Sequence, residues 1–496
     1  MAHSQEQFTS RWTLVLAVLG MAIGTGNIWR FPRIAAENGG GAFLIPWILF
    51  LFLWSIPLII TEFAIGKKTR LGPVGAIGHL IGKKWTWMGG FVAFCTVAIM
   101  FYYSVVVGWC LKYTWAALMG DLGQGASTTF WDEFINSPGQ TLFFHLLSVT
   151  AGALIISRGV TKGIERATRL LIPGLGILLV IGAIRALTLE HAMQGLNFLF
   201  EPDWAKLMDY RVWIAALSQS AWSTGAGWGL VLTYAVYARK NEDIVLNSVI
   251  AGLGNNSASL LAGIVIFPAV FALAPQLNLG ISPAELLSTS GPASTGLTFI
   301  WIPRLFSEIP ASGFFLFIFF LALSIAAISS LIAMFELAAR SLMNLGMTRE
   351  KAVLFVWLIC FIFGAPSALS MDFFQNQDWV WGVGLIVSGF FIAFSANRYG
   401  LRRFRQELIN TAGNDLKAGV WYEYVMRFVI PFLFVVLLGW WFYQAITVYH
   451  RDTWWDPLAL YSVATCLVQW GSVILLFVIF NDKIYHRTAQ AQEELS

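Results

Sequence analysis

An apolar segment near the N-terminus is interrupted by residues that a membrane-spanning helix normally excludes. The run is Ala22-Ile23-Gly24-Thr25-Gly26-Asn27-Ile28-Trp29-Arg30-Phe31-Pro32. Backbone polar groups freed by a break are costly in hydrocarbon, so a broken helix at membrane depth is tolerated only where it lines a cavity or is buried in protein. A second interruption, Thr224-Gly225-Ala226-Gly227-Trp228-Gly229, lies in a later apolar segment. Two such breaks at corresponding places in two halves of a chain indicate a binding site between them.

The composition places the whole chain in a membrane. Of its 496 residues, 57% are hydrophobic and only 12% are charged, with a mean hydropathy of +0.69. Soluble proteins carry about a quarter charged residues. Twelve apolar segments are centred near residues 22, 53, 103, 148, 176, 226, 260, 326, 358, 388, 435 and 468. Each approaches or exceeds the roughly 20 residues that cross a bilayer, so we predict an all-α integral membrane protein with twelve transmembrane helices.

The distribution of Lys and Arg predicts the orientation. With the N-terminus inside, 22 of the 31 Lys and Arg residues fall in cytoplasmic segments, where such residues are enriched in membrane proteins. Both termini are therefore expected to face the cytoplasm. Short outer segments without cysteine pairs favour a bacterial or archaeal inner (plasma) membrane. The net charge of +4 reflects this bias and indicates no nucleic-acid partner.

Several function classes lack their sequence signals. Cys95, Cys110, Cys360 and Cys466 lie in apolar segments without metal-ligand spacing and are expected to be packing residues. There is no Walker lysine loop for ATP and no nucleophile–base set, so we do not expect an enzyme.

The chain divides into two sets of five spans followed by an added pair. We predict a cytoplasmic N-terminus at 1–11, a first repeat at 12–188 and a second at 211–400, each opening with its broken helix. Spans eleven and twelve occupy 401–480, and a cytoplasmic tail occupies 481–496. Whether the added pair forms a homodimer interface stays open.

Five motifs carry a family resemblance. They are Gly24 to Pro32, Glu37 to Phe43, Tyr102-Tyr103, Val212-Trp213 and Ser329-Ser330. Over residues 10–400 the chain resembles a prokaryotic-type neurotransmitter:sodium symporter, of the sodium- and chloride-dependent solute carriers. The resemblance implies a five-plus-five inverted repeat with broken first and sixth helices, and sodium-coupled symport by alternating access.

By this resemblance, two sodium ions bind at the first break. The first site would use the Ala22 carbonyl, Asn27, Ser223, Asn255 and the substrate's carboxylate. The second would use the carbonyls of Gly20, Ile23 and Ala326 and the hydroxyls of Ser329 and Ser330. Such oxygens replace the water of an ion whose unaided transfer to low dielectric costs on the order of 20 kcal/mol. Alternatively, these Ser and Asn side chains only join neighbouring helices, for about 0.6 kcal/mol each.

The resemblance also implies the substrate pocket. It would be lined by Met21, Gly24, Gly26, Ile99, Tyr103, Trp222, Gly225, Trp228, Ser330 and Met334. Monoamine-carrying relatives have Asp at the Gly24 position, so Gly24 implies a neutral amino acid that brings its own carboxylate to Tyr103. Gly225 with Trp228 is similar to the sixth span of glycine transporters and favours glycine, sarcosine or alanine. Alternatively, Trp228 packs elsewhere and Gly225 admits a larger hydrophobic or aromatic amino acid.

A chloride ion is the next expectation. Relatives that work without it have a carboxylate one helical turn past the sodium-site Asn, where this chain has Ser259. Two sodium ions beside a zwitterion leave excess positive charge that attracts an anion. Its expected ligands are Trp47, Gln219, Ser223, Asn255 and Ser259, with Trp47 replacing the family's usual Tyr. Alternatively, Ser259 is neutral and a proton or nothing compensates.

Two gates complete the predicted site. Arg30 and Asp378 are expected to pair across the outer opening. At the inner opening relatives pair an Arg with an Asp, whereas this chain has Gln5 and Asn344. We therefore expect a weaker inner contact and a more populated inward-open state. Glu62 is expected to bind nearby backbone amides.

Two other function classes stay open at this point. A channel could use the same oxygens, although no ring of repeated carbonyls or carboxylates appears. A sensor that binds without transporting is expected to carry a cytoplasmic signalling extension.

Overall fold

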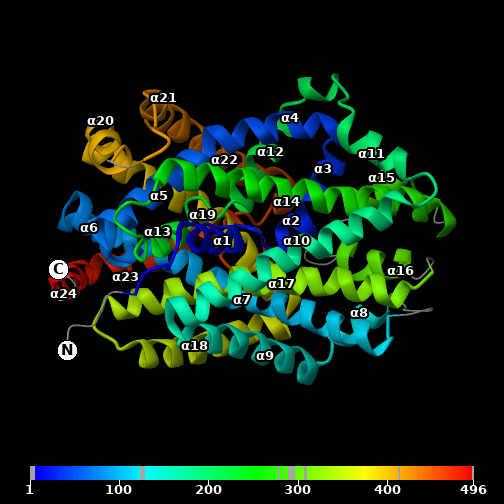
Figure 1. Ribbon diagram of the computed structural model, residues 1–496, viewed down its shortest axis with the longest axis horizontal. Coiled ribbons are helices and arrows are strands. Elements are labelled where there is room, and N and C mark those ends of the chain that lie inside the picture. The colour runs from blue at the N-terminus through cyan, green and yellow to red at the C-terminus, as the bar shows by residue number, and fades with distance from the viewer. Residues whose placement is uncertain are drawn as a thin grey trace.

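The computed structural model is helical throughout most of the part of the chain that it describes. It describes residues 6–122, 129–277, 280–288, 296–306, 310–411 and 414–493. Long helices run along the molecule, and both termini lie at the same end, beside α6 (Pro73–Ile81) and α24 (Asn481–Glu493) (Figure 1). The opposite end carries α8 (Thr129–Ile135), α11 (Ala192–Phe200) and α16 (Ile302–Phe306).

The first repeat contains spans one to five. Span one is α1 (Arg11–Ala22) followed by α2 (Thr25–Ile28) and α3 (Arg30–Glu37). The other spans are α4 (Gly41–Phe50) with η1 (Leu51–Ser55) and α5 (Ile56–Thr69), α7 (Thr86–Met119) after η2 (Lys83–Trp85), α9 (Pro138–Ser157), and η3 (Val160–Glu165) with α10 (Arg166–Leu187).

The second repeat contains spans six to ten. Span six is α12 (Tyr210–Ser223) with α13 (Leu230–Ala235). The others are α14 (Ile244–Leu273) with η5 (Ala274–Leu277), α17 (Ser312–Met343), α18 (Arg349–Leu369) and α19 (Met371–Tyr399). Shorter elements are η4 (Lys206–Met208), α15 (Pro283–Ser288) and η7 (Leu297–Trp301).

The last two spans and the tail follow. Span eleven is α21 (Trp421–Tyr424), η9 (Val425–Val429), α22 (Ile430–Gln444) and η10 (Ala445–Tyr449), preceded by α20 (Leu401–Phe404) and η8 (Arg405–Ile409). Span twelve is α23 (Val463–Ile479). The predicted tail is largely the helix α24, which bends by 63° from α23 and docks on α6. His79 stacks on Tyr485 at 4.6 Å, and Lys83 pairs with Asp482 at 2.9 Å.

The helix count agrees with the sequence. Within the described residues, nine helices are long and apolar enough to cross a membrane, or up to eleven if each of two bent pairs is one span. The sixth span fails that length test because α12 and α13 have only 14 and 6 residues. Counting span six together with these eleven gives the twelve spans that the sequence predicts.

The two breaks differ in their backbone geometry. In span one, α1 ends at Ala22, and Ile23 and Gly24 are extended. In span six, Gly225, Gly227 and Gly229 have φ values of +68°, +86° and +77°, which only glycine adopts without strain. The chain bends by 66° across the first break.

Glu62 binds the freed amides of the sixth span, as predicted. Its carboxylate accepts the backbone N–H of Gly227 at 2.6 Å and that of Leu232 at 3.1 Å. The Trp228 carbonyl accepts the Thr96 hydroxyl at 2.6 Å. These bonds satisfy backbone groups that would otherwise be buried and unpaired, so the break is a built feature. All four cysteines are buried and form no disulfide, in agreement with a packing role.

Candidate ion and substrate sites

One elongated cavity joins the two breaks. It has a volume of about 550 Å³ and extends from Met21, Gly24 and Ser330 to Tyr449 and Tyr461. Its wall includes all ten predicted substrate residues, namely Met21, Gly24, Gly26, Ile99, Tyr103, Trp222, Gly225, Trp228, Ser330 and Met334. Residues from several spans thus meet at one place, which is the geometry expected of a site between two repeats.

Gly24 lies at a point where no side chain fits without displacement. A Cβ atom there would lie 2.9 Å from Ser330 Oγ and 3.2 Å from the Tyr103 hydroxyl. The Tyr103 hydroxyl accepts the Thr25 backbone N–H at 3.4 Å. This corner of the cavity therefore presents neutral hydroxyl and amide groups to a ligand, and an acidic side chain at position 24 would have to push them apart.

Two indoles bound the cavity from the sixth span. Trp222 and Trp228 meet edge to face at 6.4 Å, and the Arg30 guanidinium lies 4.6 Å from the centre of the Trp222 ring. A Cβ atom on Gly382 would lie 2.0 Å from the Trp222 ring, so Gly382 makes room for that indole. At Gly225 the nearest atom to such a Cβ is Met21 Cε, at 3.1 Å.

The four predicted ligands of the first sodium site lie together. Asn27 Nδ2 lies 2.8 Å from Asn255 Oδ1, and Asn255 Nδ2 lies 3.0 Å from Ser223 Oγ. One atom of the Asn255 amide also lies 3.0 Å from the Ala22 carbonyl oxygen. Asn27 and Asn255 are almost fully buried. The Ala22 carbonyl, the Ser223 hydroxyl and the two side-chain amides contain neutral oxygens, which are the ligands that a hard cation takes in place of water, so these residues would fit a sodium ion.

The predicted second sodium site joins α1 to α17. Ser330 Oγ donates to the Met21 carbonyl at 3.1 Å, and Ser329 Oγ donates to the Ala326 carbonyl at 2.9 Å. Gly20 packs tightly against α10, since a Cβ there would lie 3.0 Å from Ile172. Met21 lies between Gly20 and Ile23 in the chain, so the two hydroxyls and the three predicted carbonyls come from segments in contact.

The predicted chloride residues leave several buried polar atoms without partners. Ser259 Oγ accepts from Asn27 Nδ2 at 2.8 Å. Both side-chain polar atoms of Gln219 and the indole nitrogen of Trp47 are buried with no hydrogen-bond partner among the described residues. A buried unsatisfied group costs about 1–3 kcal/mol, so these atoms are a place where a ligand is expected. The Trp47 ring also packs on Phe31, with the two ring centroids 4.7 Å apart.

The two outer-gate residues share the cavity without touching. Arg30 and Asp378 both line it, yet none of the ion pairs within the described residues joins them. Arg30 Nη2 instead lies 3.5 Å from Ser218 Oγ. The predicted pair is therefore separated in this conformation.

A family profile decides the relationship to known proteins. The profile of the Sodium:neurotransmitter symporter family matches residues 5–134 and 132–485. The chain belongs to this family. The symporter is therefore a sodium-dependent membrane transporter and not an enzyme.

Relatives agree over nearly the whole chain. A sodium-dependent transporter of Haemophilus influenzae is 31% identical over 87% of this symporter and 97% of the relative. One of Methanocaldococcus jannaschii is 32% identical over 88% and 90%. Among solved structures, MhsT in complex with L-phenylalanine superposes with a TM-score of 0.76 at 33% identity, covering 88% of this chain and 99% of that one.

The end of the symporter that carries both termini, which is the inner end in the predicted orientation, contains a charged network that the sequence interpretation missed. Arg349 pairs with Glu6 at 3.0 Å and with the fully buried Glu336 at 2.8 Å. The Tyr237 hydroxyl donates to Glu336 and lies 3.2 Å from Arg349 Nη2. The only sequence signal is charges of opposite sign in two segments that both lie near the predicted cytoplasmic face.

The predicted inner-gate residues have other roles or lie outside the described part. Asn344 Oδ1 accepts the Gly72 backbone N–H at 2.8 Å. Gln5 precedes the first described residue, so its contact with Asn344 stays a prediction. The N-terminal segment is held nearby, because Phe8 is buried and its backbone N–H donates to the Tyr237 carbonyl at 3.1 Å.

Proposed function

We propose that the chain couples the inward movement of sodium, with two ions bound, to the uptake of a small neutral amino acid such as glycine, sarcosine or alanine. The proposal includes alternating access and a bound chloride ion. The observation that carries it is the meeting of Ala22, Asn27, Ser223 and Asn255 beside the Gly24 corner of the cavity.

A neutral amino acid is favoured because the ten predicted substrate residues carry no charge, although Arg30, Arg33, Glu37 and Asp378 line other parts of the same cavity. A zwitterion supplies its own carboxylate, which can be shared by the first sodium ion and the Tyr103 hydroxyl. Its ammonium group is attracted to carbonyls freed at the sixth-span break. A cationic or anionic substrate side chain confined to those ten residues would lie unpaired, at a cost of several kcal/mol.

A small side chain is favoured by the two indoles. Trp222 and Trp228 both line the cavity beside Gly225, and indoles are the largest side chains available to narrow a pocket. A larger substrate is the second candidate, since the MhsT structure was solved with L-phenylalanine. The atom nearest to the Gly225 Cβ position is the end of the flexible Met21 side chain, which a larger ligand could displace.

Chloride is favoured by the unpaired atoms of Gln219 and Trp47 and by the neutral hydroxyl of Ser259, where chloride-independent relatives have a carboxylate. Two sodium ions and a zwitterion carry a net charge of +2, and an anion among buried donors reduces it. Each positive charge moved inward gains about 2.3 kcal/mol per 100 mV. Two sodium ions thus supply most of the driving force even when one chloride enters with them.

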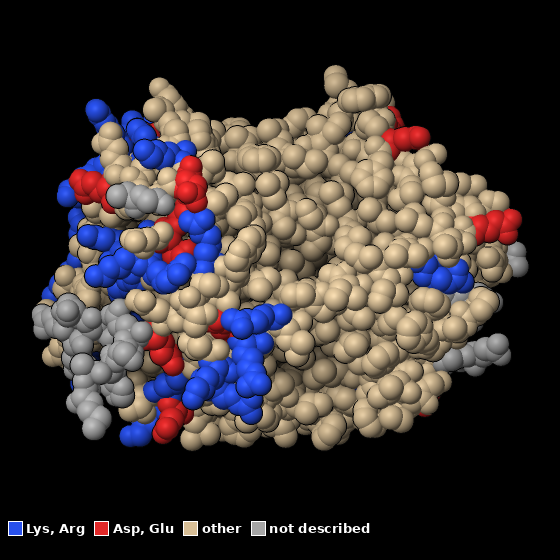
Figure 2. All heavy atoms as spheres, in the orientation of Figure 1, with Lys and Arg blue, Asp and Glu red and all other residues tan. Residues whose placement is uncertain are grey.

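The proposed orientation places both termini in the cytoplasm of a cell with an inner (plasma) membrane. Lys and Arg gather at one end of the molecule (Figure 2), the end at which Figure 1 places both termini. This asymmetry supports the proposal because cytoplasmic segments are enriched in Lys and Arg. A dimer through spans eleven and twelve stays open.

The test is uptake of radiolabelled glycine into proteoliposomes under an inward sodium gradient, with chloride or gluconate outside. We expect accumulation that requires sodium and falls in gluconate. Gly24→Ala should abolish it, because its Cβ meets Ser330 Oγ, whereas Gly174→Ala, which meets no atom within 4 Å, should not. Uptake of phenylalanine without glycine would reject the small substrate and keep the symporter. Uptake of either without a sodium gradient would reject symport.

A further inference from the structure

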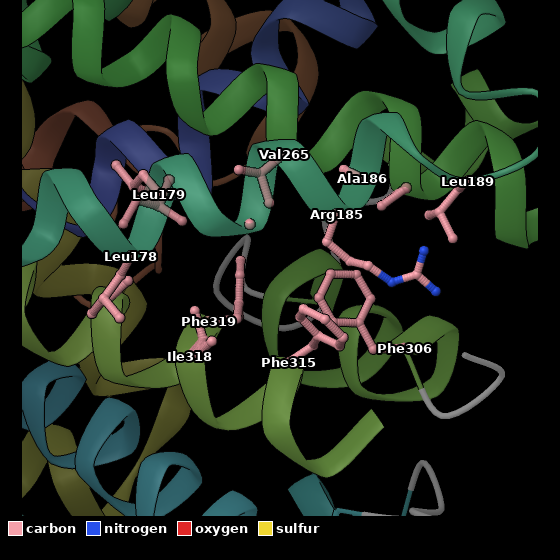
Figure 3. Close-up of a pocket in the computed structure, with 14 residues that line it drawn as sticks. Leu178, Leu179, Arg185, Ala186, Leu189, Val265, Phe306, Phe315, Ile318 and Phe319 are labelled. Atoms are coloured by element: carbon pink, nitrogen blue, oxygen red, sulfur yellow. The ribbon is translucent and has the colours of Figure 1, made fainter. Parts of the chain in front are cut away.

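A narrow apolar cleft runs along the membrane face of the molecule between α10, α14 and α17. Its wall includes Leu178, Leu179, Val265, Ile318 and Phe319, and nearly all of its exposed lining is apolar. Figure 3 shows these side chains from one end of the cleft to Arg185 at the other. The cleft is separate from the substrate cavity, since the two share no lining residue.

Arg185 is the one charged residue in this wall. It lies in the last turn of α10, at the end of the span away from both termini, where lipid headgroups are expected. Its guanidinium donates to the Thr188 hydroxyl at 2.9 Å and lies 5.5 Å from the centre of the Phe315 ring. None of the ion pairs within the described residues includes Arg185, and Figure 3 shows its guanidinium extending away from Leu178 and Leu179.

The shape and chemistry of the cleft restrict what fills it. Water is disfavoured in the cleft because the cleft offers almost no hydrogen-bond partner. An empty cleft is also disfavoured, because the side chains of its wall would lack dispersion contacts on one side. The bilayer supplies a chain of methylene groups that ends in a phosphate, and guanidinium binds phosphate through paired, charge-assisted hydrogen bonds. We propose that the cleft binds one phospholipid of the surrounding bilayer, with an acyl chain between the three helices and the phosphate on Arg185.

The inner end of the cleft reaches the broken first span. Ile28, which is 1% exposed, lines the cleft and directly follows Asn27 of the proposed first sodium site. Gly182 keeps the cleft open between α10 and α14, because a Cβ there would be in ordinary contact with Val265 at 3.4 Å and a longer side chain would enter the slot. A bound acyl chain therefore touches α2, the segment that carries Asn27.

The test uses a phosphatidylglycerol with a photoreactive group on one acyl chain, incorporated at low mole fraction into nanodiscs with the full chain. After irradiation, the labelled peptides are quantified by mass spectrometry. We expect labelling concentrated on residues 178–189, 265–269 and 318–322. Arg185→Gln should lower it about fivefold, the effect of one basic residue on an anionic lipid surface, and Gly182→Leu should block it without removing the cation.

Arg211→Gln is the matched control, because Arg211 is an exposed arginine at the same end of the molecule and outside the cleft. It should leave the labelling unchanged. Uniform labelling of all lipid-facing helices would overturn the proposal, and so would equal labelling of the wild type and Arg185→Gln. Competition with a free fatty acid is a further check. If the fatty acid reduces labelling by the photoreactive lipid as well as unlabelled phosphatidylglycerol does, the phosphate has no part in binding and the proposal is overturned. The readout needs no transport, so its failure is distinguishable from failure of the proposed function.

Discussion

Replacing Glu6 by Gln tests whether the N-terminal segment closes the inner end. Glu6 Oε2 lies 3.0 Å from Arg349 Nη2, and the two side chains are 44% and 15% exposed. A partly exposed pair of this kind contributes about 1 kcal/mol, which corresponds to about a fivefold change in an equilibrium constant. We expect Glu6→Gln to raise the ratio of inward-open to inward-closed molecules by that factor.

The variant acts mainly on the ion pair, because the Gln amide oxygen can still accept the Val160 N–H that lies 3.3 Å from Glu6 Oε2 and because Arg349 keeps a second partner. Glu336 stays paired with Arg349 at 2.8 Å, so no buried charge is left alone. Arg349→Gln is different, since it leaves the fully buried Glu336 unpaired and should cost about 3 kcal/mol or more. The free-energy cost of Glu6→Gln is therefore expected to be well below that of Arg349→Gln.

The assay is a distance distribution between spin labels at Trp12→Cys on α1 and Lys84→Cys on η2. Both positions are exposed, and the four native cysteines are buried, so labelling is selective. The long-distance population should grow about fivefold relative to the short one in Glu6→Gln. Glu350→Gln, which removes an exposed carboxylate beside Arg349, is the control. Identical distributions in the Glu6→Gln variant and in the chain that retains Glu6, or an equal shift in the control, would refute the reasoning.

Three further predictions concern the ion sites and the tail. Ser330→Ala removes the hydroxyl that binds the Met21 carbonyl and should raise the half-saturating sodium concentration of uptake about tenfold, the effect of about 1.4 kcal/mol; an unchanged sodium curve would contradict the second site. Ser259→Glu should make uptake independent of chloride, measured in gluconate, because its carboxylate replaces the anion. Burial lowers the pKa of His79 below its ordinary value, so the folded state favours neutral His79, and docking of α24 is complete above about pH 6.5 and weakens as the pH falls below it. The protection factors of the α24 amides, that is, their exchange rates relative to the intrinsic rate at each pH, should fall accordingly at pH 5, and His79→Gln should remove this pH dependence.

The breaks could be predicted because they are local, whereas the proposed ion-binding residues were assigned through the family resemblance. Gly225, Gly227 and Gly229 are the residues that φ values above +60° require, and Asn255 and Ser259 share one helix face by spacing alone. The outer gate shows the limit. Arg30 and Asp378 could be assigned to one opening, but their separation depends on which conformation the molecule adopts, and a sequence that supports alternating access encodes more than one.

Contacts between distant segments were harder to foresee. Glu6 and Arg349 are 343 residues apart, and the sequence around either residue does not indicate that it contacts the other. Gly159 gives a retrospective signal, because its φ is +77° and a Cβ there would lie 2.2 Å from Glu6 Oε1. The docking of α24 on α6 likewise depends on single pairs such as His79 with Tyr485, which hydropathy does not detect.

The inner network changes what the uncharged Gln5 and Asn344 imply. Their lack of charge predicts a weak inner contact, yet Glu6 ties the start of α1 to the α17–α18 end through Arg349 and Glu336. The proposed second sodium site ties the other end of α1 to α17 through Ser330. The charged network and the proposed sodium site therefore both hold α1 against α17. Because binding and closure are linked reciprocally, Glu6→Gln should also raise the half-saturating sodium concentration, by up to the factor by which it opens the inner end. A shift in conformation with no shift in sodium dependence would mean that the two contacts act on different motions.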